Sequence, residues 1–427
     1  MPEEPKTTGI IEGVHADPLY LSALASLGAS VPAKLLATPV KGSIAVTPFV
    51  NMSGDPGQEH FTDGLTEDII TDLSNVDGFF VIARNSTFAY KGKSTDVHQI
   101  AYDLGVNYVL EGSARRSDKR LRINVQLIDA AEGGNHVWAE RFDRDLVDIF
   151  QVQDEVALRI VEAITGKLAP NSISERYHPT NLEAYDLVVS SRWQFLTSKQ
   201  ACSDAQSKLE RAVKLDPDYP EAHWLLAMTQ HFNWWNWNGN TEPDRRNAMT
   251  SAQKAVELAP NEAWAHGVLG YIMAGEMRWV ESQAQFERAL RLNPSDADIH
   301  MGMADYYIGD SQPHKAMEHL ATALRLNPYP SGVFFWELGM VQICIGHYAE
   351  AVVTLRREET YNTGSRRNLI VALVLLGNVD EAKKEAQLFH IENPTWTISY
   401  WADLVPFKST EQIKIWVDAF RLAGLPE

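Results

Sequence analysis

The chain has 427 residues, 45% of them hydrophobic, which is enough for two or three domains with packed cores. Its 38 lysines and arginines against 56 aspartates and glutamates give a formal net charge of −18, so nucleic acid and anionic membranes are unfavourable partners. Cys202 and Cys344 lie far apart and lack CxxC spacing, which excludes a cysteine-rich zinc site and a disulfide scaffold.

Five prolines interrupt residues 1–42, for which we expect a largely irregular leader with one short helix. The apolar stretch 19–31 is too short to cross a bilayer and has no basic residues before it that would mark a signal peptide. We therefore expect no membrane span and a cytoplasmic location.

Residues 43–168 alternate strand and helix signals and predict an α/β domain with a mixed sheet. Residues 44–46 and 79–83 are short apolar runs typical of buried strands. Between them, Leu65, Ile69 and Leu73 share one face of a predicted helix. A second helix over 97–104 is closed by Gly105.

The second half of this region predicts a hairpin, a further strand and a long helix. Apolar and polar residues alternate over 121–128 after a turn at 117–119, as expected of a half-buried hairpin. A strand over 136–142 precedes an amphipathic helix that places Val152, Val156 and Ile160 toward the core. Five basic residues surround the hairpin turn and fit either a solvated turn or a site for an acidic partner.

A repeated phrase dominates residues 181–394, after a linker at 169–180. The phrase, Leu-Asp/Ala/Asn-Pro, ends successive predicted helices, and Pro260, Pro294 and Pro328 are spaced by 34 residues. That period is the tetratricopeptide one, in which each repeat is a helical hairpin packed on its neighbours. We expect about six repeats, with an insertion containing Trp234, Trp235 and Trp237 in the second, and a capping helix within 395–427.

The α/β segment resembles a known family, the TolB-like (FlgO-like) amino-terminal domain. The resemblance rests on Ser43 to Pro56, on Asp63-Gly64-Leu65-Thr66-Glu67-Asp68-Ile69, and on later segments such as Val81-Ile82-Ala83-Arg84-Asn85-Ser86 and Trp138-Ala139-Glu140-Arg141. In that family this domain and its repeats typically follow a class III adenylate or guanylate cyclase domain or a winged-helix DNA-binding domain, often after a membrane helix. The resemblance implies a sensory or scaffolding role in bacterial signalling.

The sequence predicts no catalytic, cofactor-binding or metal-binding residues. Gly92-Lys93-Ser94 resembles the end of a phosphate loop, but Thr87 stands where the first glycine is required. A leader of 42 residues is too small for a cyclase domain, so we expect no cyclase activity from this chain alone.

The candidate site is the groove of the repeats, because the first helix of each repeat lines the concave face of such arrays. That register selects Trp224, Met228, His231, Trp264, Tyr271, Asp298, Met301, Asp305, Trp336 and Met340. Aromatic and methionine side chains suit an adaptable groove for an apolar or basic peptide segment. The alternative is that some of these side chains pack against the closing helix or between repeats.

The leading hypothesis is a non-enzymatic protein-interaction scaffold in bacterial signalling that binds a partner protein in this groove. The alternative is an accessory or regulatory part of a cyclase system that acts in trans on a separate catalytic chain. A DNA-binding regulator is disfavoured by the charge and by the lack of a winged-helix signal.

Overall fold

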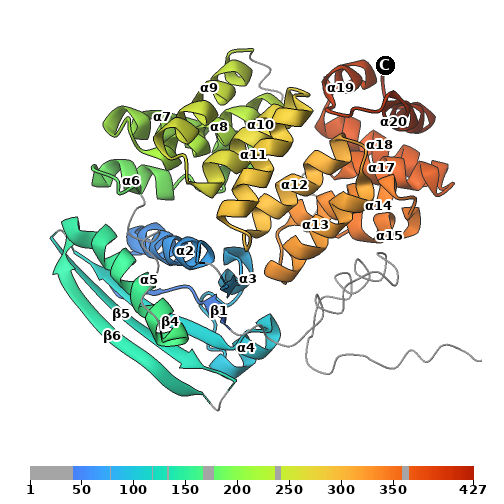
Figure 1. Ribbon diagram of the computed structural model, residues 1–427. Helices are drawn as coiled ribbons and strands as arrows, with labels where there is room; N and C mark the ends of the chain where they lie inside the picture. The colour runs from blue at the N-terminus through green and yellow to red at the C-terminus, as the bar shows by residue number, and fades with distance from the viewer. Residues whose placement is uncertain are drawn as a thin grey trace, which may run out of the picture.

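The computed structural model describes residues 42–76, 78–117, 119–131, 134–166, 177–235, 242–357 and 365–427. An α/β part with a mixed sheet is followed by a long array of helical hairpins, which confirms the predicted fold class (Figure 1). The expected leader, except Gly42, lies outside the described residues, as do most of the expected linker and Trp237.

The α/β part is built on one six-stranded sheet. Its strands are β1 (Ser43–Val46), β2 (Val50–Asn51), β3 (Phe80–Val81), β4 (Tyr108–Arg116), β5 (Arg120–Asp129) and β6 (Asn135–Asp145). The order is β3-β1-β4-β5-β6, with β2 also paired to β4. Strand β1 pairs in parallel with β3 and β4, and β2 pairs in parallel with β4, whereas β5 pairs antiparallel with β4 and β6. The predicted hairpin is therefore β4 and β5.

Helices cover both faces of this sheet. The helices are α2 (Glu59–Ser74), α3 (Arg84–Phe88), α4 (Val97–Leu104) and α5 (Ile149–Thr165). The buried side chains of α2 and α5 join those of β5 in one core, because the alternation of β5 turns its apolar residues to that side. On the other face, Ile100 and Leu104 of α4 pack with Ala45 and Val109. Gly105 ends α4 in the left-handed region, with φ of 65°.

Six helical hairpins follow within the described residues. They are α6 (Leu182–Val189) with α7 (Lys199–Leu215), α8 (Pro220–Trp235) with α9 (Glu242–Leu258), α10 (Ala263–Gly275) with α11 (Trp279–Leu292), α12 (Ala297–Gly309) with α13 (Pro313–Leu326), α14 (Gly332–Cys344) with α15 (Tyr348–Leu355), and α17 (Arg366–Leu375) with α18 (Val379–Glu392). A short 3₁₀ turn, η6 (Gln194–Leu196), separates the first two helices.

Small residues allow the two helices of a hairpin to approach closely. A Cβ atom added at Gly339 of α14 would lie 2.4 Å from Leu355 of α15, and one at Gly270 of α10 would lie 3.0 Å from Phe286 of α11. A larger side chain at Gly339 would therefore separate the helices of the fifth repeat.

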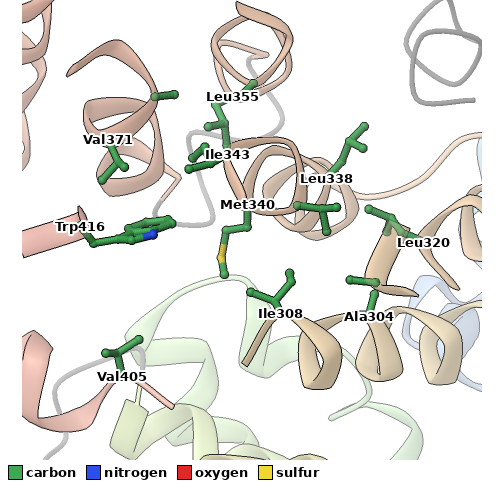
Figure 2. Packing of buried hydrophobic residues seen from close by; sticks show 14 of the residues in the cluster. Ala304, Ile308, Leu320, Leu338, Met340, Ile343, Leu355, Val371, Val405 and Trp416 are labelled. Atoms are coloured by element: carbon green, nitrogen blue, oxygen red, sulfur yellow. The ribbon is translucent and has the colours of Figure 1, made fainter. Parts of the chain in front are cut away.

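The C-terminal region contains two helices where the sequence indicated a single capping helix. They are α19 (Ile398–Leu404) and α20 (Thr410–Leu422), and we call residues 398–425 the closing segment. Pro406 and the extended Val405 break the helix between them. Figure 2 shows Met340 directed toward Ile308, with Val405 and Trp416 of the closing segment nearby.

None of the helices in the described ranges combines the length and apolar character needed to span a bilayer.

The α/β part and the repeats are joined by a buried ionic network centred on Arg192, just after α6. Its guanidinium lies 2.8 Å from Asp68 Oδ1 of α2 and 2.6 Å from Glu221 Oε1 of α8, and Glu67 lies 3.6 Å away. Only 7% of the Arg192 side chain is exposed. Burial alone would lower the pKa of Arg192, but the carboxylates of Glu221, Asp68 and Glu67 raise it well above its ordinary value.

Helix α6 belongs to both cores. Tyr185 and Val189 of α6 pack in the core of the α/β part, and Tyr185 donates a 2.7 Å hydrogen bond to Asp68. Gly64 of α2 permits this approach, because an added Cβ would lie 2.5 Å from Val189. Figure 1 shows α2 between the sheet and the repeats. The first repeat is therefore anchored in the α/β part.

The repeated Leu-Asn-Pro turns make the second set of contacts. Asn293 Nδ2 donates to Ser74 Oγ at 3.0 Å, and Ser86 Oγ donates to Asn327 Oδ1 at 2.6 Å. The backbone N–H of Ala83 donates to the carbonyl of Leu326 at 2.9 Å. The same phrase that ends the helices of repeats three and four therefore docks the array onto the α/β part.

We expect Arg192→Met to destabilise the protein by about 3–5 kcal/mol, because it leaves buried carboxylates without a counter-ion. Methionine retains the packing of the aliphatic stem, so the loss reports the charge. Urea unfolding of both proteins measures the difference in the free energy of unfolding.

The matched control is Arg211→Met, which removes an exposed ion pair with Glu183. We expect this variant to lose less than about 1 kcal/mol. A small loss in both variants would contradict a central role for Arg192.

Candidate functional site

A cavity of about 540 Å³ lies against the first helices of repeats two to five. Its walls come from α8, α10, α12 and α14, and it is closed by η6 at one end and by α17, α18 and α19 at the other. Asn85 of α3 adds an edge from the α/β part. Cavities of roughly 300–1,000 Å³ are typical of ligand sites.

The structure brings seven of the ten predicted groove residues into the wall of this cavity. They are Met228, Trp264, Tyr271, Asp298, Met301, Asp305 and Trp336. They arise from consecutive repeats, and pairs seven residues apart, such as Asp298 and Asp305 on α12, lie two helical turns apart on one face.

The other three predicted residues lie elsewhere. Trp224 packs behind Trp264, with ring centroids 5.1 Å apart and planes 18° apart. His231 and Met340 border a smaller adjacent cavity of about 60 Å³ together with Trp416 of the closing segment. Burial lowers the pKa of His231 to about 4, so this ring is neutral at pH 7. These three residues therefore pack between repeats or against the closing segment and do not line the larger cavity.

Aromatic rings form one side of the cavity. Trp264 packs edge-on against Trp193, which follows α6, with ring centroids 5.6 Å apart. Tyr271 stacks parallel to Phe232 at 6.3 Å. Trp193 is held in a left-handed backbone conformation, with φ of 62°, and donates a 2.8 Å hydrogen bond to Glu67. The network around Arg192 therefore also positions a wall of the cavity.

Carboxyl groups form the floor. Asp305 of α12 and Glu337 of α14 both border the cavity, on neighbouring first helices. Burial raises the pKa of Asp305 to about 6, and burial together with the Asp305 charge raises the pKa of Glu337 well above its ordinary value.

Asp298 and its neighbour Asp296 are two further carboxyl groups near the cavity. Burial raises the pKa of Asp298 well above its ordinary value, and the neighbouring charges of Asp296 and Glu67 raise it further. Burial also raises the pKa of Asp296 to about 6, while hydrogen bonds from Ile299, Asp298 and the Trp264 side chain oppose that change. Acidic groups therefore extend along the length of α12.

Two arginines of α17 also border the cavity. Arg366 is paired with Glu385 at 2.5 Å and with Glu392 at 3.6 Å. Arg367 has no ion pair within the described parts of the chain, and burial lowers its pKa to about 10. The cavity lining thus combines acidic, aromatic and cationic side chains.

The sequence analysis missed several of these residues. Glu337 is the single acidic residue in the apolar run 332–345. An isolated acidic residue in such a run is a sequence signal for a functional side chain. Trp193, Arg367 and Trp401 come from outside the first helices of repeats two to five, and only the fold brings them to the cavity.

Other reactive groups offer no second site. Burial raises the pKa of both Cys202 and Cys344 to about 12, so both thiols are unreactive at neutral pH. Among the described residues no three histidine, cysteine, aspartate or glutamate side chains come together as a metal site.

Two family models match parts of the chain. Residues 278–331 match the tetratricopeptide repeat, in agreement with the 34-residue period and the helical hairpins. The repeats are therefore of the tetratricopeptide type. Residues 40–159 match a model described as the second domain of HilA/YgeH-like transcriptional regulators.

A curated relative from Rhizobium meliloti (strain 1021), named "Putative adenylate cyclase 3", is 47% identical over 257 residues. The match covers 59% of this chain and 43% of the relative. The chain thus matches less than half the length of that protein.

Solved structures that match parts of the chain include PilW, a type IV pilus biogenesis factor, and TolB from Acinetobacter baumannii. PilW is 18% identical with a TM-score of 0.37, and the match covers 51% of this chain and 94% of PilW. TolB is 21% identical with a TM-score of 0.24, and the match covers 31% of this chain and 30% of TolB.

We expect Asp305→Asn to flatten the pH dependence of stability between about pH 4 and pH 6. The pKa of Asp305 is about 6 in the folded protein against an ordinary value of 3.8. Its contribution to the stability of the fold is therefore full below pH 4 and is lost as pH rises through 6. We compare the free energy of unfolding of the variant with that of the wild type. Their difference should be about 1–3 kcal/mol more favourable to the variant at pH 7 than at pH 4. Urea unfolding at pH 4, 5, 6 and 7 measures this.

Asp403→Asn, at an exposed carboxylate of α19, is the control and should follow the wild type across the same range. Parallel curves for Asp305→Asn and the wild type would show that Asp305 titrates without perturbation.

Proposed function

We propose that the chain is a non-enzymatic interaction scaffold that binds a segment of a partner protein in the cavity of its repeats. The observation that carries this proposal is the composition of that cavity: aromatic, methionine and acidic side chains from consecutive repeats on one continuous surface. Buried aromatic anchors contribute most of the affinity in protein interfaces. We place the repeats at 181–394, with the cap in the closing segment.

We infer that residues 43–168 form a TolB-like sensory or docking domain that fixes the direction of the groove. The mixed sheet with α2 and α5 on one face supports this assignment. Its contacts through Arg192, Asn293 and Asn327 span repeats one to four, so the array is held as a rigid support for the cavity.

Site-specific photo-cross-linking tests the groove. A photoreactive benzoylphenylalanine at Met301 faces the cavity, whereas one at Val280, which is 82% exposed on α11, faces away from it. In native host cells we expect a discrete cross-linked partner from position 301 only. Equal cross-linking from both positions, or none from 301, would contradict the proposal.

A second function has one specific observation in its favour, namely the 47% identity to the relative named as an adenylate cyclase. Under this alternative the chain regulates a nucleotide cyclase carried on another polypeptide. Its test is cyclic AMP in native host cells with and without the chain. A change of several-fold, with no ATP turnover by the pure chain, is the expected result, and an unchanged level would reject it.

A further inference from the structure

The acidic floor of the cavity contains buried polar atoms that the protein itself does not satisfy. Glu337 is 2% exposed, and its Oε1 atom has no hydrogen-bond partner within the described residues. The indole Nε1 of the neighbouring Trp336 is likewise buried without an acceptor. Unsatisfied buried polar atoms are costly in folded proteins, so a ligand with a donor for Glu337 and an acceptor for Trp336 would find partners here.

The charge around these atoms selects the ligand. Burial and the nearby carboxylates raise the pKa of Tyr271 and Cys344, so both are neutral at pH 7. His231, which is neutral at pH 7, and Arg367 border the smaller adjacent cavity together with Asp305. Within the described residues neither Asp305 nor Glu337 forms an ion pair with a basic side chain of the protein.

The shape of the site favours a cation on an apolar stem. Trp264, Tyr271 and Trp336 border the same cavity as the carboxyl pair. Tryptophan and tyrosine faces attract an ammonium or guanidinium group, and they also pack along a hydrocarbon chain. Lysine and arginine side chains combine these two features.

We propose that the cavity binds an extended segment of a partner protein through a lysine or arginine side chain whose cationic group is held by Asp305 and Glu337. The aromatic walls pack along the aliphatic stem of that residue and its apolar neighbours. This inference rests on the proposed scaffold function and adds the chemistry of the partner.

The test is selection from a phage-displayed library of random 12-residue peptides against the full chain. We expect the selected peptides to contain a lysine or arginine at a fixed position beside apolar residues. Affinities of one selected peptide are then measured by tryptophan fluorescence. Acetylation or norleucine replacement of its basic residue should weaken binding roughly 10–100-fold, as expected for loss of a charge-assisted hydrogen bond.

The double variant Asp305→Asn/Glu337→Gln should weaken binding of the same peptide by a similar factor, because it removes the charge and preserves the shape. The control variant Glu287→Gln/Glu318→Gln makes the same change in net charge at exposed positions of α11 and α13 and should bind like the wild type. Urea unfolding of both variants establishes that they are folded.

The possible results separate the two proposals. Selected peptides without a basic residue, or full affinity of Asp305→Asn/Glu337→Gln, would overturn the cation site and leave the scaffold function standing. Failure to enrich any peptide would overturn both. Butylammonium that binds as tightly as the peptide would assign the site to a small organic cation, which also overturns the peptide proposal.

Discussion

The arrangement of the molecule depends on the burial of one guanidinium group. Arg192 lies where α6 ends, and it faces carboxylates from the α/β part and from the second repeat at once. A buried charge is tolerated only when its partners are held in place, so α2, α6 and α8 must keep their relative positions. Glu67 of the same network accepts a hydrogen bond from Trp193, which carries this constraint into the cavity wall.

The cavity itself follows from how the array ends. Tetratricopeptide hairpins expose their first helices along one side, and neighbouring repeats alone would leave that side open. In this chain α19 turns back, and Trp401 reaches the wall opposite α10 and α12. The closing segment also covers Met340 and Ile308 (Figure 2). One end of the array is thereby filled, and the remainder is a partly open cavity.

Periodicity predicted the helical array and seven residues of the cavity wall because both are local consequences of the 34-residue repeat. The register that selected Trp264, Met301 and Asp305 requires only the pitch of a helix and the stacking of hairpins. It failed to distinguish Met340 from them, since that side chain is buried by the distant Val405 and Trp416. Arg367 and Trp401 escaped prediction for the same reason. That the wall residues bind a partner stays a prediction.

The carboxyl pair also explains why such a groove would be retained at a cost in stability. Burial raises the pKa of both acidic side chains, and the charge of Asp305 raises that of Glu337 further, which weakens the fold at neutral pH, so packing alone would favour an apolar pair at these positions. A cation bound between them relieves the repulsion and the desolvation together. Since a ligand that binds only the folded state stabilises it, occupancy of the cavity should rigidify the repeats that supply Asp305 and Glu337. The same two residues thus lower the stability of the unoccupied fold and provide the proposed binding site for the partner.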